Sequence, residues 1–214
     1  MKKITDIYTE YNIMPNLQAH QFRVAGVASQ VCNSLNVPID TRSVISACLL
    51  HDMGNIIKFH LETFPEFLEP EGLTYWQNIQ NEYLSRYGHD EHEATVKIIQ
   101  ELGLSEDIVE LANQNRFSWL CKHKESDNLA LKIIHYADAR VGPHGVLSYD
   151  ERMDDAGVRY ANHKNSIEEE KRHALVLCGK EIEKQIFSHS KIKPEDINDE
   201  STALYMEDLK NFEI

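Results

Sequence analysis

Glycine and proline are both scarce in this chain, with nine and six residues among 214. A sandwich or a barrel needs many tight turns, and such turns depend on these two residues. Apolar residues recur instead at three- and four-residue steps almost from end to end, which is typical of amphipathic helices. With no internal repeat and no low-complexity linker, the sequence predicts an all-α fold and a single domain over 1–214.

Basic residues are also in deficit, 22 against 35 acidic ones, which gives a formal net charge of −13. A surface this acidic repels nucleic acid duplexes and anionic membranes, so neither is an expected partner. Apolar runs are too short for a membrane span, and charge follows Met1 too soon for a signal peptide. An anionic substrate would therefore need a local group of cations or a metal ion to draw it in.

Cysteine is limited to four residues with no Cys-x-x-Cys pair: Cys32, Cys48, Cys121 and Cys178. Each one lies in an apolar stretch, where a small buried thiol is the simplest interpretation. Four unpaired thiols predict a reducing, cytoplasmic environment.

The apolar periodicity predicts helices at 17–35, 40–51, 72–86, 90–103, 106–120, 126–140 and 165–187, with a further one in the tail after 193. Asp40 is the expected N-cap of the second, and Gly54 marks its end. The aromatic segment 59–70 is expected to be a loop or short helices. The apolar stripe of 165–187 would pack on the chain's own core or on a second subunit of a homodimer.

One short motif carries most of the chemical information, the pair His51-Asp52 at the end of an apolar run. His20 lies in the preceding predicted helix and Asp138 near the end of a later one, each within its own apolar pattern. Imidazole and carboxylate groups are common ligands of divalent transition metals, and bundle cores gather such ligands from several helices. We therefore predict that His20, His51, Asp52 and Asp138 bind one divalent metal ion.

These residues resemble the HD-domain superfamily of metal-dependent phosphohydrolases. The resemblance lies in the stretches 19–25 (AHQFRVA), 49–54 (LLHDMG), 88–94 (GHDEHEA) and 136–143 (YADARVGP). It extends over about 15–150, with the C-terminal helices of 151–214 packed on that core. It implies a helical bundle with a central metal site formed by the four ligands named above. The ion would be Mn, Fe, Co, Ni, Zn or Mg.

The resemblance also implies a role for His89, at a second metal or at the substrate phosphate. Relatives with two metals usually carry a further histidine in the next helix, but 105–120 contains none. This departure argues against a binuclear centre and against the mixed-valent iron oxygenases of the superfamily. Asn55 stands where some nucleotidases of the family have a catalytic glutamate. Asp52 and His89 are therefore the predicted catalytic residues.

The predicted activity is hydrolysis of a small phosphate ester, with a nucleotide as one candidate, by a metal-activated water. Lys58 and Arg140 follow the metal ligands Asp52 and Asp138 closely in sequence, so they are expected to bind the substrate phosphate. Arg23, one turn after His20, either faces the site or ties helices together through carboxylates. The alternative function is a non-catalytic regulatory module that binds a metal or a nucleotide.

Overall fold

The computed structural model describes residues 2–160 and 167–214, and no strand ladder occurs within those ranges. The α-helices are α1 (Ile4–Glu10), α2 (Pro15–Ser34), α3 (Thr41–Leu50), α4 (Leu73–Tyr87), α5 (Glu91–Glu101), α6 (Glu106–Asn113), α7 (Leu120–Lys124), α8 (Leu129–Asp138), α9 (Tyr149–Tyr160), α10 (Glu169–Phe187) and α11 (Asp199–Leu209). The 3-10 helices are η1 (Asn55–Lys58), η2 (Leu61–Thr63), η3 (Pro65–Leu68), η4 (Phe117–Trp119) and η5 (Pro194–Asp196). The predicted all-α class is confirmed.

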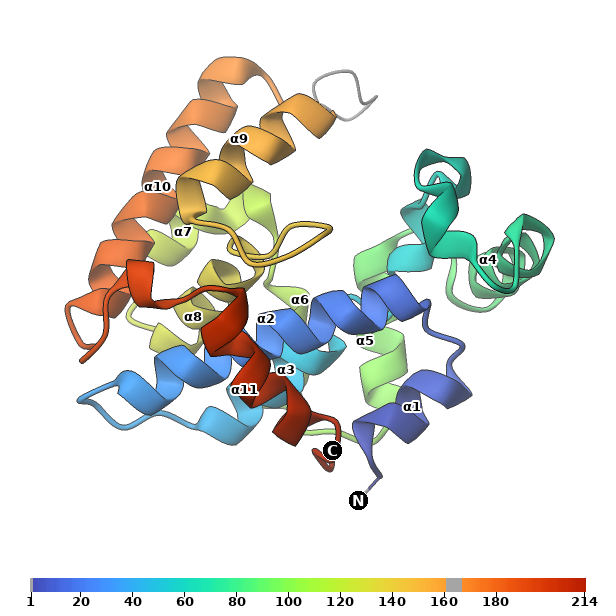
Figure 1. The fold of residues 1–214 in the computed structure, drawn as a ribbon, viewed down its shortest axis with the longest axis horizontal. Helices are drawn as coiled ribbons and strands as arrows, with labels where there is room; N and C mark the ends of the chain where they lie inside the picture. Colours follow the sequence, from blue (N-terminus) through green and yellow to red (C-terminus); the bar gives the residue numbers. More distant parts are fainter. Residues whose placement is uncertain (1, 161–166) are drawn as a thin grey trace.

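The long helix α2 occupies the centre of the structure, where it packs against α3, α8 and α11 (Figure 1). The two ends of the chain meet beneath it, because the amide of Lys2 donates to Ile214 O at 3.1 Å and the amide of Ile214 donates back to Lys2 O at 2.9 Å. Among the described helices, none has the length and apolar content that crossing a bilayer requires. The C-terminal helix α11 packs directly on the central helix α2.

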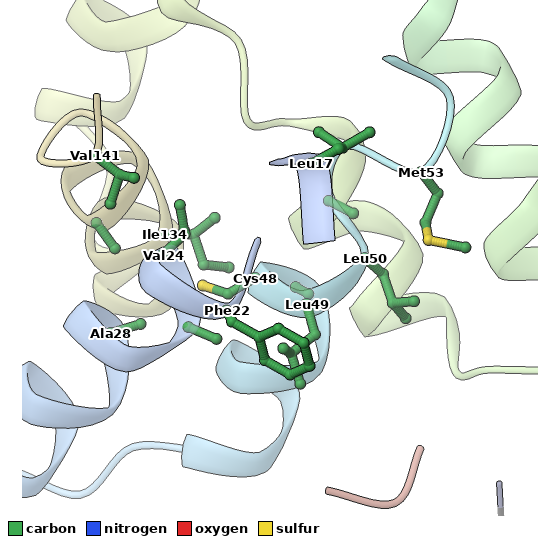
Figure 2. Close-up of a cluster of buried hydrophobic side chains, with 14 of the residues drawn as sticks. Leu17, Phe22, Val24, Ala28, Cys48, Leu49, Leu50, Met53, Ile134 and Val141 are labelled. Carbon is green, nitrogen blue, oxygen red and sulfur yellow. The ribbon is translucent and has the colours of Figure 1, made fainter. Parts of the chain in front are cut away.

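Apolar side chains of α2, α3 and α8 form a continuous buried cluster (Figure 2). Val24 and Ala28 of α2, Cys48 and Leu49 of α3, and Ile134 of α8 have no exposed surface. Burying a side chain of the size of leucine or isoleucine contributes about 1.5–3 kcal/mol. Since the candidate metal ligands lie on or directly after these three helices, this core fixes their relative positions.

Most predicted helices occur within a few residues of their expected bounds, namely α2, α3, α4, α5 and α8. Asp40 caps α3 as expected, because its Oδ1 accepts a hydrogen bond from the amide of Ser43 at 3.1 Å. The segment 59–70, predicted to be a loop or short helices, forms short helices.

One predicted helix, 106–120, is wrong as a continuous element. Helix α6 ends at Asn113, and after a non-helical stretch the chain resumes with η4 and α7. The interruption falls on the polar run of Asn113, Gln114 and Asn115, whose side chains compete with the backbone for hydrogen bonds. At this break the Asn115 amide bonds to Asp138, at 3.1 Å from its Oδ2.

Helices α1 and α9 were not among the predicted elements. In α1, Ile4, Ile7 and Tyr8 share one buried face, but seven residues are too few for a strong periodic signal. The expected start of the last long helix, at 165, lies outside the described residues, and α10 begins at Glu169.

Gly54 follows α3 at a point of very close packing against α5. A Cβ atom at this position would lie 2.4 Å from Glu91 O and 2.7 Å from the Cβ of Ala94. The amide of Gly54 also donates to Thr95 Oγ1 at 2.9 Å. The first turn of α5 is therefore held directly against the turn that follows His51.

The prediction that all four cysteines are free thiols is wrong for two of them. Cys121 of α7 and Cys178 of α10 form a disulfide, whereas Cys32 and Cys48 are free and buried as expected. No sequence pattern predicts this pair, because its members are 57 positions apart and become neighbours only when α7 packs on α10.

Candidate metal centre

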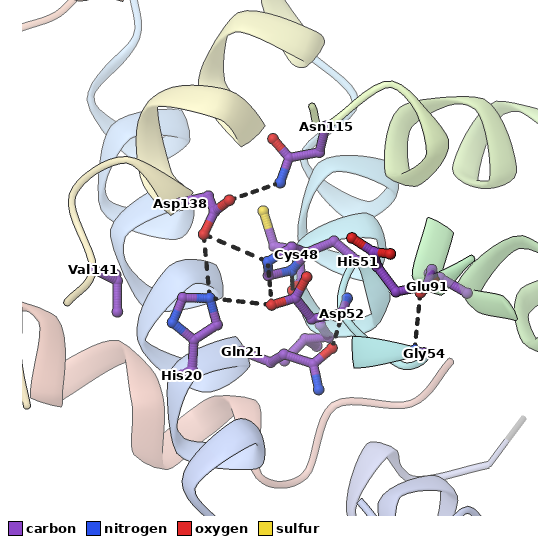
Figure 3. A network of polar contacts seen from close by, with 12 residues as sticks. His20, Gln21, Cys48, His51, Asp52, Gly54, Glu91, Asn115, Asp138 and Val141 are labelled. Carbon is purple, nitrogen blue, oxygen red and sulfur yellow. Dashed lines mark hydrogen bonds and ion pairs between the residues drawn. The ribbon is translucent and has the colours of Figure 1, made fainter. Parts of the chain in front are cut away.

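Four side chains from three helices converge beside the central core (Figure 3). His20 lies in the second turn of α2, His51 is the C-cap of α3, Asp52 follows it, and Asp138 is the last residue of α8. These are the four predicted metal ligands, and the structure brings all of them together.

The distances between their polar atoms are short and similar. His20 Nε2 lies 3.2 Å from Asp138 Oδ1 and 3.6 Å from Asp52 Oδ2. His51 Nε2 lies 3.5 Å from the same Asp52 oxygen and 3.6 Å from the same Asp138 oxygen. His20, His51 and Asp52 also form a group whose candidate ligand atoms all lie within 4.8 Å of one another.

The orientation of His51 suits a metal ligand. Its Nδ1 lies 2.8 Å from the carbonyl oxygen of Cys48, so this nitrogen carries the proton and donates it. The other nitrogen, Nε2, is buried, forms no hydrogen bond with any described residue and points at the two carboxylates. Metal-binding histidines are typically oriented in this way, with one nitrogen donating to a carbonyl and the other left for the ion.

The donor set also fits a divalent ion in spacing and chemistry. Bonds of about 2.1 Å to nitrogen and oxygen separate neighbouring donors by roughly 3 to 3.5 Å. The four distances above are of this size. Two imidazoles with two carboxylates suit Zn, Fe, Ni, Co or Mn, and the mixed nitrogen and oxygen set does not choose among them.

The charges of the cluster favour a bound cation. Burial by itself lowers the pKa of His51, but the carboxylates of Asp52 and Asp138 outweigh it and raise this pKa to about 9. Burial raises the pKa of Asp138, yet its contacts with His20 and His51 hold it well below its ordinary value. A proton on His51 and a metal ion at Nε2 therefore compete for the same lone pair.

This competition predicts a pH dependence for the metal-free protein. The pKa of His51 rises from about 6.5 in the unfolded chain to about 9 in the fold, so its contribution is complete below pH 6.5. Between pH 6.5 and 9 the unfolded chain has lost this proton while the fold still binds it, so we expect the free energy of unfolding to fall by about 3 kcal/mol over this range. Urea denaturation in the presence of a chelator, at pH values from 6.5 to 9.5, measures this change in the free energy of unfolding.

The His51→Gln variant is the control, because glutamine does not titrate. Its free energy of unfolding should change much less over the same pH range, and the difference between the two curves isolates the imidazole. Parallel curves for the wild type and the variant would show that no proton is held between the carboxylates.

Two residues that support the metal ligands were not predicted from the sequence. Asn115 donates to Asp138 Oδ2, and the Oε1 atom of the buried Gln21 lies 3.4 Å from the backbone nitrogen of Asp52 (Figure 3). Such contacts orient a ligand and tune its basicity. For Gln21 the signal was its place beside His20 in an otherwise apolar stretch. For Asn115 there was none, since its role depends on where α6 breaks.

Two histidines lie at the start of α5, His89 just before the helix and His92 in its first turn, and only His89 was predicted to act at the site. The side chain of His89 is exposed, one residue before the N-cap Asp90, and no ion pair joins it to the four-ligand cluster within the described residues. His92 is more enclosed, with its Nε2 3.7 Å from Glu91 Oε1. Lys58 reaches the same Glu91 carboxylate at 3.4 Å, which places this predicted substrate contact at the α5 side of the site.

Arg140, the second predicted substrate contact, is not at the site. Its side chain is buried, with 2% of the residue exposed. The guanidinium donates to Tyr136 Oη and to the backbone oxygens of Leu147, Pro194 and Ile197. Since four of its five donors are used, Arg140 joins α8 to the C-terminal segment, and this correction leaves Lys58 as the remaining predicted cation.

His135 shares a helix with Asp138, but it is a buried structural residue. Its ring packs 4.8 Å from the ring of His123, and burial together with that neighbour lowers the pKa of His135 to about 3. His135 is therefore neutral at physiological pH.

Comparison with known proteins gives one family. The family model described as HD domain matches residues 17–141, well over half of the chain. The matched region contains all four residues of the cluster. No curated protein and no solved structure shows significant similarity to the chain.

Proposed function

Because the chain belongs to the HD domain family, we propose that it is a metal-dependent phosphohydrolase acting on a small phosphate ester. The observation that carries this proposal is the convergence of His20, His51, Asp52 and Asp138, with the bare Nε2 of His51 directed at both carboxylates. That arrangement supports a role of these four side chains as metal ligands.

The ligands lie open to solvent on one side, which favours an enzyme over a structural metal site. The side chains of His20, Asp52 and Asp138 are 20%, 19% and 34% exposed, whereas that of His51 is 2% exposed. Structural metal sites are usually closed by protein ligands, while catalytic sites leave room for water and substrate.

When bound, a divalent ion would lower the pKa of a coordinated water and supply a nucleophile near neutral pH. Asp52, within reach of both histidines, is the proposed catalytic carboxylate, and it holds the water by accepting its proton. Lys58, the last residue of η1, pairs with Glu91 and is proposed to neutralise the substrate phosphate. His89 is exposed just before α5, and its proposed catalytic role is to contact the substrate phosphate.

The regulatory module remains the second candidate, because the same ligands would hold an ion in a sensor. Two measurements separate the candidates. One is the metal content of the purified protein by inductively coupled plasma mass spectrometry. The other is turnover of generic phosphate esters with each divalent ion, in the wild type, His51→Ala and His89→Ala.

We expect about one transition metal per chain, lost in His51→Ala and kept in His89→Ala, and hydrolysis that requires the ion. Metal without turnover of any ester would favour the regulatory module. Absence of metal after incubation with Mn, Co, Ni and Zn would contradict the hydrolase and leave a regulatory module that binds a nucleotide as the leading candidate.

A further inference from the structure

A cavity of about 390 Å³ lies beside the candidate metal centre. One wall is the N-terminal half of α2, and the others are the η3 region and the turn after α8. The lining residues are Pro15, Asn16, Ala19, Arg23, Glu66, Phe67, Glu69, Pro143 and His144. A volume of this size holds a small organic molecule.

Helix geometry connects this cavity to the metal ligands. Asn16, His20 and Arg23 are separated by four and then three positions, so they lie along one face of α2. Asn16 and Arg23 line the cavity, and the metal ligand His20 lies between them. A molecule held by the metal centre at one end can therefore extend into the cavity at the other.

On the α2 wall of the cavity, Asn16 has a buried Oδ1 without a hydrogen-bond partner among the described residues, and the cation of this wall is Arg23. It is partly buried, and it forms no hydrogen bond or ion pair with any residue in the described ranges. Other enclosed arginines of the chain are engaged, for example Arg140 with backbone carbonyls and Arg116 with Asn113. A guanidinium with five donors and partial burial is best satisfied by an anion, which binds in a bidentate manner.

The opposite wall is apolar and aromatic. The ring of Phe67 lies 6.0 Å from the ring of His144 and 5.2 Å from that of Phe64. Pro15 and Pro143 extend this surface. Glu66 and Glu69 are exposed and carry charge at the rim, so the anion-binding group is Arg23 on the helix wall.

We propose that this cavity binds the non-reacting end of the substrate, and that Arg23 pairs there with a second anionic group carried on a flat apolar body. The proposal rests on the proposed phosphohydrolase function, because it places the reacting phosphate at the metal centre. It names the substrate class as phosphate esters with a second anion, a carboxylate or a second phosphate.

The test uses phosphonates, which are not hydrolysed, so that binding is measured without turnover. Phenylphosphonate is compared with its 3-carboxy, 4-carboxy and 4-phosphono derivatives by isothermal titration calorimetry on the metal-loaded full chain. The wild type should bind at least one of the three derivatives that carry a second anionic group about 10- to 100-fold more tightly than phenylphosphonate. In Arg23→Gln this preference should vanish while phenylphosphonate binds unchanged.

Arg86→Gln is the matched control, since it removes the same charge from an exposed arginine outside the cavity. Metal content and thermal melting of both variants show that the fold is retained. Equal affinity of the wild type for all four ligands would overturn the subsite while leaving the metal centre in place. An equal loss for all ligands in Arg23→Gln would show that Arg23 holds the reacting phosphate instead. If no ligand binds the metal-loaded protein, the proposed function fails and this inference with it.

Discussion

Asp52→Asn is expected to lower metal-dependent hydrolysis by about 10³-fold or more, which corresponds to about 4 kcal/mol of lost transition-state stabilisation. Asparagine has the shape of aspartate, so the α3 turn and its packing on α5 should persist. The substitution removes the negative charge of the carboxylate, which attracts the ion and allows the side chain to accept a proton from water. Steady-state kcat/KM with the best ester of the metal and substrate screen measures the effect.

Asp150→Asn is the matched control, because Asp150 is a surface carboxylate that pairs only with Lys180 at 2.7 Å among the ion pairs of the described residues. Its kcat/KM should remain within a factor of two of the wild type. Metal analysis of Asp52→Asn then separates two causes, since reduced activity with full metal content assigns Asp52 to the chemistry. Undiminished hydrolysis in Asp52→Asn would place the reaction elsewhere or attribute it to a contaminant.

The four ligands could be predicted because each is fixed by local pattern. His20 and Asp138 lie within strongly periodic helices, and His51 with Asp52 ends a third, so the three helices needed only to pack on one another. Their buried faces are set by the same apolar periodicity that predicts the helices. Sequence alone therefore contained both the fold class and the identity of the cluster.

The misplaced cation shows what the sequence does not contain. Arg140 lies two residues after Asp138, but it follows the end of α8, where no helical periodicity fixes its direction. Its partners Pro194 and Ile197 are 54 and 57 positions away, and their carbonyls attract the guanidinium. Proximity in sequence to a metal ligand was thus a poor guide to proximity in space.

Arg23 is the complementary case. Its periodic position left two interpretations open, a substrate contact or an ion pair between helices. The second would need a carboxylate partner, and no described residue supplies one. The first depends on residues 66–69 and 143–144, which approach α2 only in the folded chain. Tertiary contacts of this kind decide specificity, and single-sequence patterns do not reveal them.

Loss of the disulfide is the second large expected effect. Cys121→Ser should lower the free energy of unfolding of the oxidised protein by about 4 kcal/mol, because the bond closes a loop of 57 positions between α7 and α10 in the unfolded chain. Urea denaturation without reductant compares the two proteins. With dithiothreitol present throughout, wild type and variant should unfold at nearly the same urea concentration, which is the internal control.

A thiol count tests the prediction about the redox environment of the protein. Free thiols predicted a reducing compartment, whereas a persistent disulfide is typical of oxidising ones. Thiol titration of protein purified without reductant and then unfolded should count two thiols per chain, those of Cys32 and Cys48. A count of four, with equal stability of wild type and Cys121→Ser in the absence of reductant, would contradict the disulfide.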